Sequence, residues 1–167
     1  MKQGRSLWWL CVCWMMCSCA AHQYTTKMEQ EFMLDGKISR ADLKKDFPWF
    51  DANYKKYVLN DTAVTELKPF AGELKVMLVM GTWCSDSKEH VPEFFKVADA
   101  IGLKDTQVEM IAVNRKKQST SVDVAPLKIE FVPTFIFFRD GRQIGSIVED
   151  THENMEKDML HIIRVAK

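Results

Sequence analysis

Cys84 stands alone in the stretch GTWCSDSKEHVPEFF, which runs from Gly81 to Phe95. Trp83 precedes it, and Ser87 occupies the position three residues later where a second cysteine would complete a dithiol pair. Because an apolar run precedes Cys84 and a helical pattern follows it, we expect the thiol at the first turn of a helix. The helix dipole and the free backbone amides at that turn stabilise a thiolate, which is the form that attacks disulfides.

The side chains that follow Cys84 act on a thiolate in opposite directions. The Ser87 hydroxyl, one turn further along, can donate a hydrogen bond to the sulfur, whereas the Asp86 carboxylate disfavours a second negative charge. Ser85 is the remaining residue of the sequence from Cys84 to Ser87. His90 falls about 240° around the helix from Cys84, so we interpret it as a surface histidine and not as a catalytic base. The alternative interpretation of Cys84 itself is a buried structural cysteine, as most single cysteines are.

The composition is that of a globular protein with one domain and an additional N-terminal segment. The chain has 167 residues, of which 47% are hydrophobic and 28% charged, which suits one compact domain. The formal net charge is zero, so neither nucleic acid nor an anionic membrane surface is favoured as a partner. Four of the five cysteines lie between Cys11 and Cys19, a distribution that predicts neither a disulfide scaffold nor a zinc site. The sequence implies no metal and no organic cofactor.

Residues 1–19 have the pattern of an export signal. Lys2 and Arg5 provide a positive start, and the apolar run from Leu7 to Met16 is followed by the small residues of CSCAA. This run is too short to span a bilayer comfortably, and its flanks are those of a signal peptide. A tryptophan-rich start of a cytosolic domain is a weaker alternative.

The signal has two alternative endings. Cleavage near Ala20 or Ala21 would release a soluble protein into the periplasm. The sequence MCSC also resembles the bacterial lipoprotein box, with Ser18 before a lipidated Cys19, and we favour this second interpretation. Residues 20–38 would then be a tether, and the protein would work in the oxidising cell envelope.

The rest of the chain predicts a mixed α/β fold. Residues 39–60 are expected to form short aromatic-rich helices, capped by Ser39 and interrupted at Pro48. Residues 61–167 form the main domain, in which Asp140-Gly141 predicts a hairpin turn. A parallel start and an antiparallel end predict a central mixed sheet flanked by helices. The expected strands cover 74–81, 107–113, 135–138 and 142–148, and the expected helices cover 62–70, 85–100 and a segment from 150 or 151 onwards.

Two stretches, MLVMGTWCSDSKEHVPEFFKVAD and EFVPTFIFFRDGRQIGSIV, together resemble thioredoxin-like proteins from about Thr62 to the C-terminus. Pro92 matches the proline that kinks the active-site helix, and Pro133 matches the cis-proline that faces the catalytic sulfur. The resemblance implies a thioredoxin-like fold, and FPWF with GTWCSDS looks most like the secreted lipoproteins of this type in Bacteroides-like bacteria. It implies a catalytic Cys84 assisted by Ser87, a substrate groove at Trp83, Val132 and Pro133, and motif positions at Ser85, Asp86, Pro92 and Thr134.

Two residues depart from the family pattern. Ser87 replaces the resolving cysteine, and Leu78 stands where thioredoxin has a buried acid. The sequence therefore predicts a monothiol enzyme of the envelope in which Cys84 forms mixed disulfides with disulfide- or thiol-containing proteins. Release would need a small thiol, a membrane reductase or a second cysteine of the substrate, which favours isomerisation or small-thiol-dependent exchange. The alternative is a redox-inactive module that binds peptides or proteins; a peroxidase is remote, because its Pro-x-x-x-Thr-x-x-Cys setting is absent.

Overall fold

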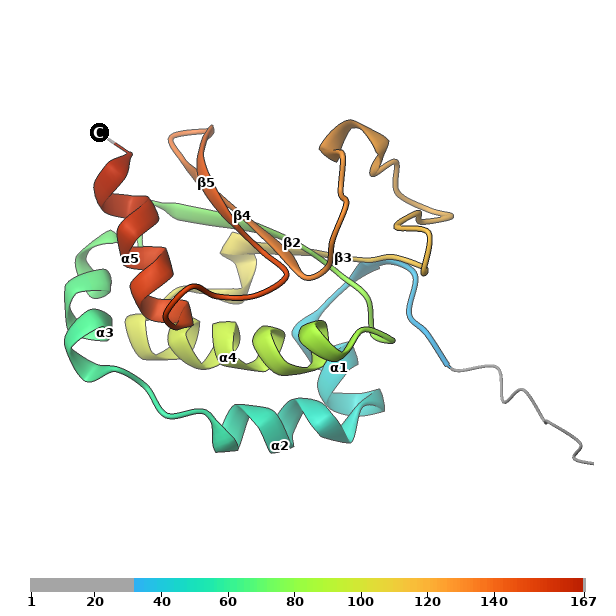
Figure 1. Cartoon of the computed structure of the whole chain (residues 1–167), viewed down its shortest axis with the longest axis horizontal. Helices are drawn as coiled ribbons and strands as arrows, with labels where there is room; N and C mark the ends of the chain where they lie inside the picture. Colours follow the sequence, from blue (N-terminus) through green and yellow to red (C-terminus); the bar gives the residue numbers. More distant parts are fainter. Residues whose placement is uncertain (1–31, 167) are drawn as a thin grey trace, which may run out of the picture. The chain divides into compact units, whose positions relative to one another are not determined.

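The computed structural model describes residues 32–166 (Figure 1). The predicted signal, Cys19 and the first part of the predicted tether lie outside the described residues. Among the residues that are described, no helix is long and apolar enough to cross a membrane.

A five-stranded mixed sheet forms the centre of the described chain, with strand order β1-β3-β2-β4-β5. β2 and β3 are parallel, whereas the β1–β3, β2–β4 and β4–β5 pairs are antiparallel. This arrangement confirms the predicted mixed sheet. The strands are β1 (Gly36–Ile38), β2 (Leu74–Met80), β3 (Val108–Ala112), β4 (Thr134–Arg139) and β5 (Arg142–Val148).

The α-helices gather on one side of this sheet, as Figure 1 shows. Their apolar side chains share one core with alternate residues of β2, namely Val76, Leu78 and Met80. The alternation follows from the strand period of two, which sends successive side chains to opposite faces. The helices are α1 (Arg40–Asp46), α2 (Pro48–Lys56), α3 (Asp61–Leu67), α4 (Ser85–Ile101) and α5 (Met155–Val165), with short 3₁₀ turns at Lys68–Phe70, Asp105–Gln107 and Ala125–Leu127.

The aromatic N-terminal extension packs directly on α4. Ser39 caps α1 through a capping box with Asp42, and Pro48 begins α2, as predicted from the sequence. Phe50 is fully buried, and its ring lies 5.8 Å from that of Phe95 on α4. The extension is therefore part of the main hydrophobic core.

Asn53 of α2 compensates for the hydrogen bond that Pro92 removes from α4. A proline inside a helix has no N–H for the carbonyl four residues earlier, which here belongs to Lys88. The Asn53 side-chain amide donates to that carbonyl at 2.8 Å. The helix is thereby tied to the extension just after its first turn.

Residues 36–38 form β1, although the sequence pattern placed them in the tether. This short strand pairs with β3, with Lys37 opposite Ile111. The preceding residues are also held, because Leu34 N–H donates to Thr82 Oγ1 at 3.2 Å and the Asp35 carboxylate accepts from the Thr120 N–H. Three residues have no detectable period, so only their long-range pairing reveals the strand.

The C-terminal part agrees with the prediction except at the start of α5. Asp140 and Gly141 form the β4–β5 turn with positive φ angles of 52° and 74°, as Asp-Gly hairpins require. The helix, however, starts at Met155 with Asn154 as its cap, and not at 150 or 151. Asp150 instead has a partner on α4, described below.

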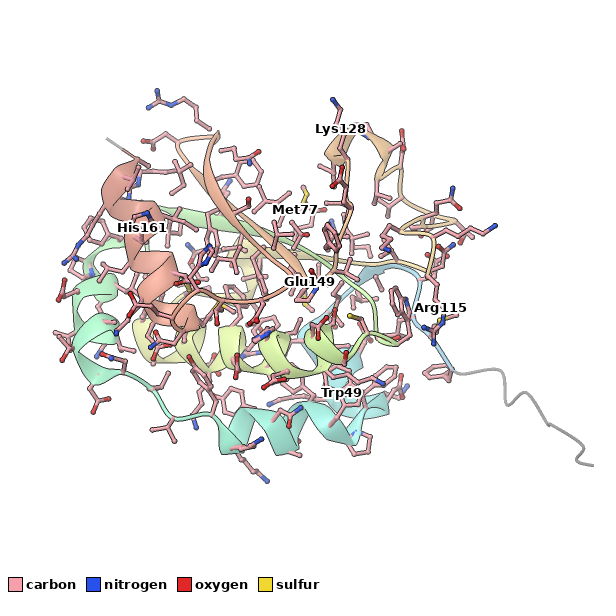
Figure 2. The ribbon with its side chains drawn as sticks, viewed as in Figure 1. Trp49, Met77, Arg115, Lys128, Glu149 and His161 are labelled. Carbon is pink, nitrogen blue, oxygen red and sulfur yellow. The ribbon has the colours of Figure 1, made fainter. Side chains whose placement is uncertain are left out.

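The second face of the sheet is covered in part by the segment between β3 and β4, residues 113–133. A small separate cluster of buried side chains lies there, made by Val79, Ile111, Val113, Val124 and Val132. The segment contains a single 3₁₀ turn and otherwise no regular secondary structure. Figure 2 labels Met77 on this face and Lys128 in the covering segment.

Candidate active site

Cys84 lies at the junction of β2 and α4 and is the N-cap residue of the helix. Its N–H donates to Gly81 O at 2.9 Å, and its carbonyl accepts from Lys88 N at 3.1 Å. The residue is partly exposed and its thiol is free. The structure thus places the sulfur at the first turn of the helix, where the sequence predicted it.

The Cys84 thiol faces two oxygen atoms. Sγ lies 3.1 Å from Val132 O and 3.7 Å from Asp86 Oδ2. Because a thiol has one proton, it can donate to one of these acceptors at a time.

Ser87 points into the protein interior and not towards the sulfur. Its side chain is fully buried, and its Oγ accepts from the Gly81 N–H at 3.3 Å. The hydrogen bond from Ser87 to Cys84 that the sequence suggested is therefore not formed. The physical reason is that Gly81 follows the last residue of β2, and its buried amide needs a partner that the sheet does not supply.

Trp83 packs, like Cys84, against the small cluster on the second face of the sheet. Its Nε1 donates to Val113 O at 2.9 Å, and the Arg115 guanidinium lies 4.9 Å from the centre of its ring. A Cβ on Gly81 would come within 2.6 Å of the indole, so this position has room only for glycine while Trp83 keeps its place. Figure 2 shows Arg115 in the segment that follows β3.

The backbone of residues 131–134 also approaches the sulfur, through Val132 O. The Val132–Pro133 peptide bond is cis, and both residues are buried. Thr134 Oγ1 donates to Phe131 O at 2.7 Å, and the Phe131 side chain is 47% exposed. The structure brings Cys84, Trp83 and Val132 into one cluster, with Pro133 and Thr134 adjacent in the chain.

The remaining motif residues support the helix and strand that hold Cys84. Pro92 is buried within α4. Leu78 of β2 is fully buried in the main core, so the position of the expected acid holds an apolar side chain. Ser85 is exposed and its hydroxyl donates to Asp86 Oδ1 at 3.2 Å.

His90 is not the surface histidine that the sequence suggested. Its side chain is only 12% exposed and lies between the carboxylates of Glu93 and Asp150. Helix position alone could not show this, because Asp150 comes from the segment after β5. A shallow pocket beside the first turns of α4 is lined by His90 and by acidic residues, namely Asp86, Glu89, Glu149 and Asp150.

The architecture and the position of the thiol agree with the comparison with known families. The thioredoxin family matches residues 51–161. The chain belongs to the thioredoxin family. A thioredoxin domain with an accessible thiol at the start of its active-site helix has a general role in thiol–disulfide redox chemistry. Among residues 32–166, no group of three or more histidine, cysteine or acidic side chains is arranged to hold a metal ion.

Individual relatives are distant. This thioredoxin-family chain is 28% identical over 102 residues to a thioredoxin-like protein of Acanthamoeba polyphaga mimivirus, covering 61% of this chain and 71% of the viral protein. It is 31% identical over 90 residues to a thioredoxin of Alternaria alternata, covering 53% and 70% of the two chains. A crystal structure of a Pseudomonas aeruginosa protein of unknown function superposes with a TM-score of 0.61 at 12% identity, covering 78% of this chain and 94% of that one. This last likeness shows the fold.

Proposed function

We propose that this protein is a monothiol thiol–disulfide exchange enzyme of the bacterial cell envelope, of the Bacteroides-like lipoprotein type. Cys84 is the nucleophile, and Trp83, Val132 and Pro133 line the substrate groove. The observation that carries the proposal is the pairing of a partly exposed Cys84 sulfur, 3.1 Å from Val132 O, with a buried hydroxyl at the resolving position. The thiol of the motif is partly exposed beside the proposed groove, whereas Ser87 stands at the resolving position.

The proposed reaction is thiol–disulfide exchange, in which Cys84 is a thiolate at the beginning and at the end. The Cys84 thiolate attacks one sulfur of a substrate disulfide, a new Cys84–substrate S–S bond forms, and the other substrate sulfur leaves as a thiolate that takes a proton. A low-molecular-weight thiol or a second substrate cysteine then attacks the mixed disulfide, and Cys84 leaves as the thiolate. With the second substrate cysteine the result is isomerisation. With small thiol, the first equivalent forms a disulfide with the substrate, and the second attacks that disulfide and releases the substrate thiol. The substrate is then reduced and the small thiol is oxidised to its disulfide.

The groove supports an extended substrate. Val132 O accepts the weak hydrogen bond of the Cys84 thiol, which the N–H of an incoming strand can replace in the manner of β-augmentation. The exposed Phe131 ring adds apolar area beside it. A redox-inactive binding module is not favoured, because such a module needs no accessible thiol beside its groove.

The decisive experiment is to follow the lifetime of the mixed disulfide. The full chain is treated with a short peptide whose single cysteine is joined to 2-nitro-5-thiobenzoate, and adducts are located by peptide mass spectrometry. We expect an adduct on Cys84 that persists in the absence of thiol and disappears when glutathione is added. In Cys84→Ala that adduct should be absent, while the melting temperature remains that of the parent. A parent chain whose Cys84 stays unmodified would overturn the proposal and leave peptide binding as the function to test.

The envelope location is proposed from the sequence of residues 1–19, and it makes a separate prediction. In an expressing bacterium, we expect the parent chain in the detergent-soluble membrane fraction and labelled by a fatty-acid analogue. Cys19→Ala should abolish the label because the acylated sulfur is removed, whereas Cys17→Ala should keep it. Labelling that survives Cys19→Ala, or that never occurs in the parent, would contradict a lipid anchor at Cys19.

A further inference from the structure

His90 bridges two segments that are distant in sequence. Its Nδ1 lies 2.7 Å from Glu93 Oε2 on the same helix, and its Nε2 lies 3.1 Å from Asp150 Oδ1 in the segment after β5. A neutral imidazole has one N–H and could donate to only one of these carboxylates. The imidazolium donates to both, so this geometry fits a charged histidine.

The segment that His90 holds leads directly to the substrate groove. Glu149 precedes Asp150, has a positive φ of 66°, and donates its N–H to Pro133 O at 2.7 Å. Pro133 follows Val132, whose carbonyl faces the Cys84 sulfur. One continuous series of contacts therefore runs from His90 through Asp150 and Glu149 to the groove. Figure 2 labels Glu149 at the end of the hairpin.

We propose that His90 is a positioning residue that, in its charged form, ties the Glu149–Asp150 segment to α4 and thereby holds the Val132–Pro133 edge in register with Cys84. This role rests on the proposed function, because it concerns the groove in which the substrate of Cys84 lies. It gives the enzyme a preference for extended peptide disulfides at mildly acidic pH, while small disulfides that need no groove react independently of His90.

The surrounding charges favour the imidazolium. On α4, Glu89 and Glu93 act on His90 and Asp86 lines the same pocket; from the other segment, Glu149 and Asp150 face it. The hydrogen bond to Glu93 raises the pKa of His90 above its ordinary value of 6.5, burial opposes this, and the charges of Asp150 and Glu89 add to it.

Glu93, the helix partner of His90, also interacts with Tyr57 in the connection after α2, and Tyr57 in turn contacts α5. The Tyr57 hydroxyl, on which Glu93 also acts, donates to the buried Glu156 carboxylate at 2.6 Å. Lys96, one turn after Glu93, donates to the Tyr57 carbonyl at 2.6 Å. The Lys96 ammonium is thus directed to that carbonyl.

The direction of the pH effect follows from the raised pKa. The charged form of His90 contributes fully to stability below pH 6.5, its ordinary value, and this contribution is lost as the pH rises through the higher value in the folded protein. The Asp150 carboxylate is 79% exposed, so water screens part of the attraction and a moderate effect is expected.

The test compares two disulfides of different size in the full chain. The first is the peptide–thiobenzoate disulfide described above, and the second is hydroxyethyl disulfide. Because both react with the same Cys84 thiolate, the ratio of their rate constants cancels the ionisation of Cys84. We expect this ratio to fall roughly threefold to tenfold between about pH 6 and about pH 9 in the parent. In His90→Gln the ratio should be low at both pH values.

Three further variants separate a specific role from a general loss of structure. Asp150→Asn should lower the ratio at about pH 6 as His90→Gln does, and the double variant should lower it no further. His161→Gln, at an exposed histidine of α5 (Figure 2), should leave it unchanged. A parent ratio that does not vary with pH, or a His90→Gln variant that behaves like His161→Gln, would overturn the role of His90.

Failure of the proposed function has a different signature, namely a Cys84 that reacts with neither disulfide. In that case, hydrogen exchange of the Glu149 amide at about pH 6 tests whether His90 holds the Glu149–Asp150 segment on α4, independently of any reaction of Cys84. Its protection should decrease in His90→Gln relative to His161→Gln, because the segment is released from α4. Equal protection in the two variants would overturn the inference.

Discussion

Ser87→Cys is expected to shorten the lifetime of the Cys84 mixed disulfide by about a hundredfold or more. Residues three apart on a helix are neighbours, so a thiol introduced at position 87 is expected to reach the Cys84 sulfur when its side chain rotates away from the Gly81 amide. Attack within one molecule has a far higher effective concentration than attack by millimolar thiol. The introduced sulfur bonds to the Cys84 sulfur, the Cys84–substrate bond breaks, and the substrate sulfur leaves as a thiolate and takes a proton. The measurement is the adduct lifetime without added thiol.

A matched control separates the effect of a thiol at the buried position 87 from that of a thiol introduced elsewhere. Its Oγ accepts from the Gly81 N–H, a role that a cysteine sulfur fills only weakly. Ser146→Cys provides the matched control, because it adds a thiol at an exposed position of β5 and should leave the lifetime as in the parent. An unchanged lifetime in Ser87→Cys would show that the serine is not what makes the adduct persist.

Phe50→Ala is expected to lower the free energy of unfolding by about 3–5 kcal/mol, the usual loss for a large aromatic residue removed from a core. Phe50 is fully buried and contacts the rings of Tyr54 and Phe95 at 6.4 and 5.8 Å between centres. Since small proteins are stable by about 5–15 kcal/mol, this is a substantial fraction. The measurement is urea unfolding followed by circular dichroism.

Val58→Ala is the control for this prediction. It removes an apolar side chain after α2, in the same extension, but Val58 is 85% exposed, so the expected change stays within about 0.5 kcal/mol. A Phe50→Ala variant as stable as Val58→Ala would mean that the extension folds apart from the domain. A loss of the expected size would show that the extension is an integral part of the domain, packed on α4.

The sequence was most informative where one segment determines its own structure. The apolar run of β2, the helical pattern after Cys84 and the Asp140-Gly141 turn were all predicted correctly, because each depends on a local period or on local backbone preferences. The mixed sheet followed from the order of these elements. Pro48 at the start of α2 likewise acts through its own ring and missing amide.

The features that were missed depend on partners far along the chain. β1 has three residues, and its pairing with β3 joins positions more than seventy residues apart. The predicted hydrogen bond from Ser87 to the Cys84 sulfur was wrong, because the Ser87 hydroxyl instead accepts from the Gly81 N–H. His90 was placed at the surface from its angle on the helix alone, whereas its contact with Asp150 comes from the segment after β5.

The two faces of the sheet are covered differently, by helices on one face and by residues 113–133 on part of the other. This difference separates the stability of the protein from the properties of the proposed groove. The main core, under the helices, contains most of the buried apolar residues, whereas Trp83 and Val132 of the proposed groove belong to the small cluster under residues 113–133. A covering without regular secondary structure can open locally for only part of the free energy of global unfolding. We therefore expect changes in residues 113–133 to affect the proposed groove more than the free energy of global unfolding, which the helical side determines.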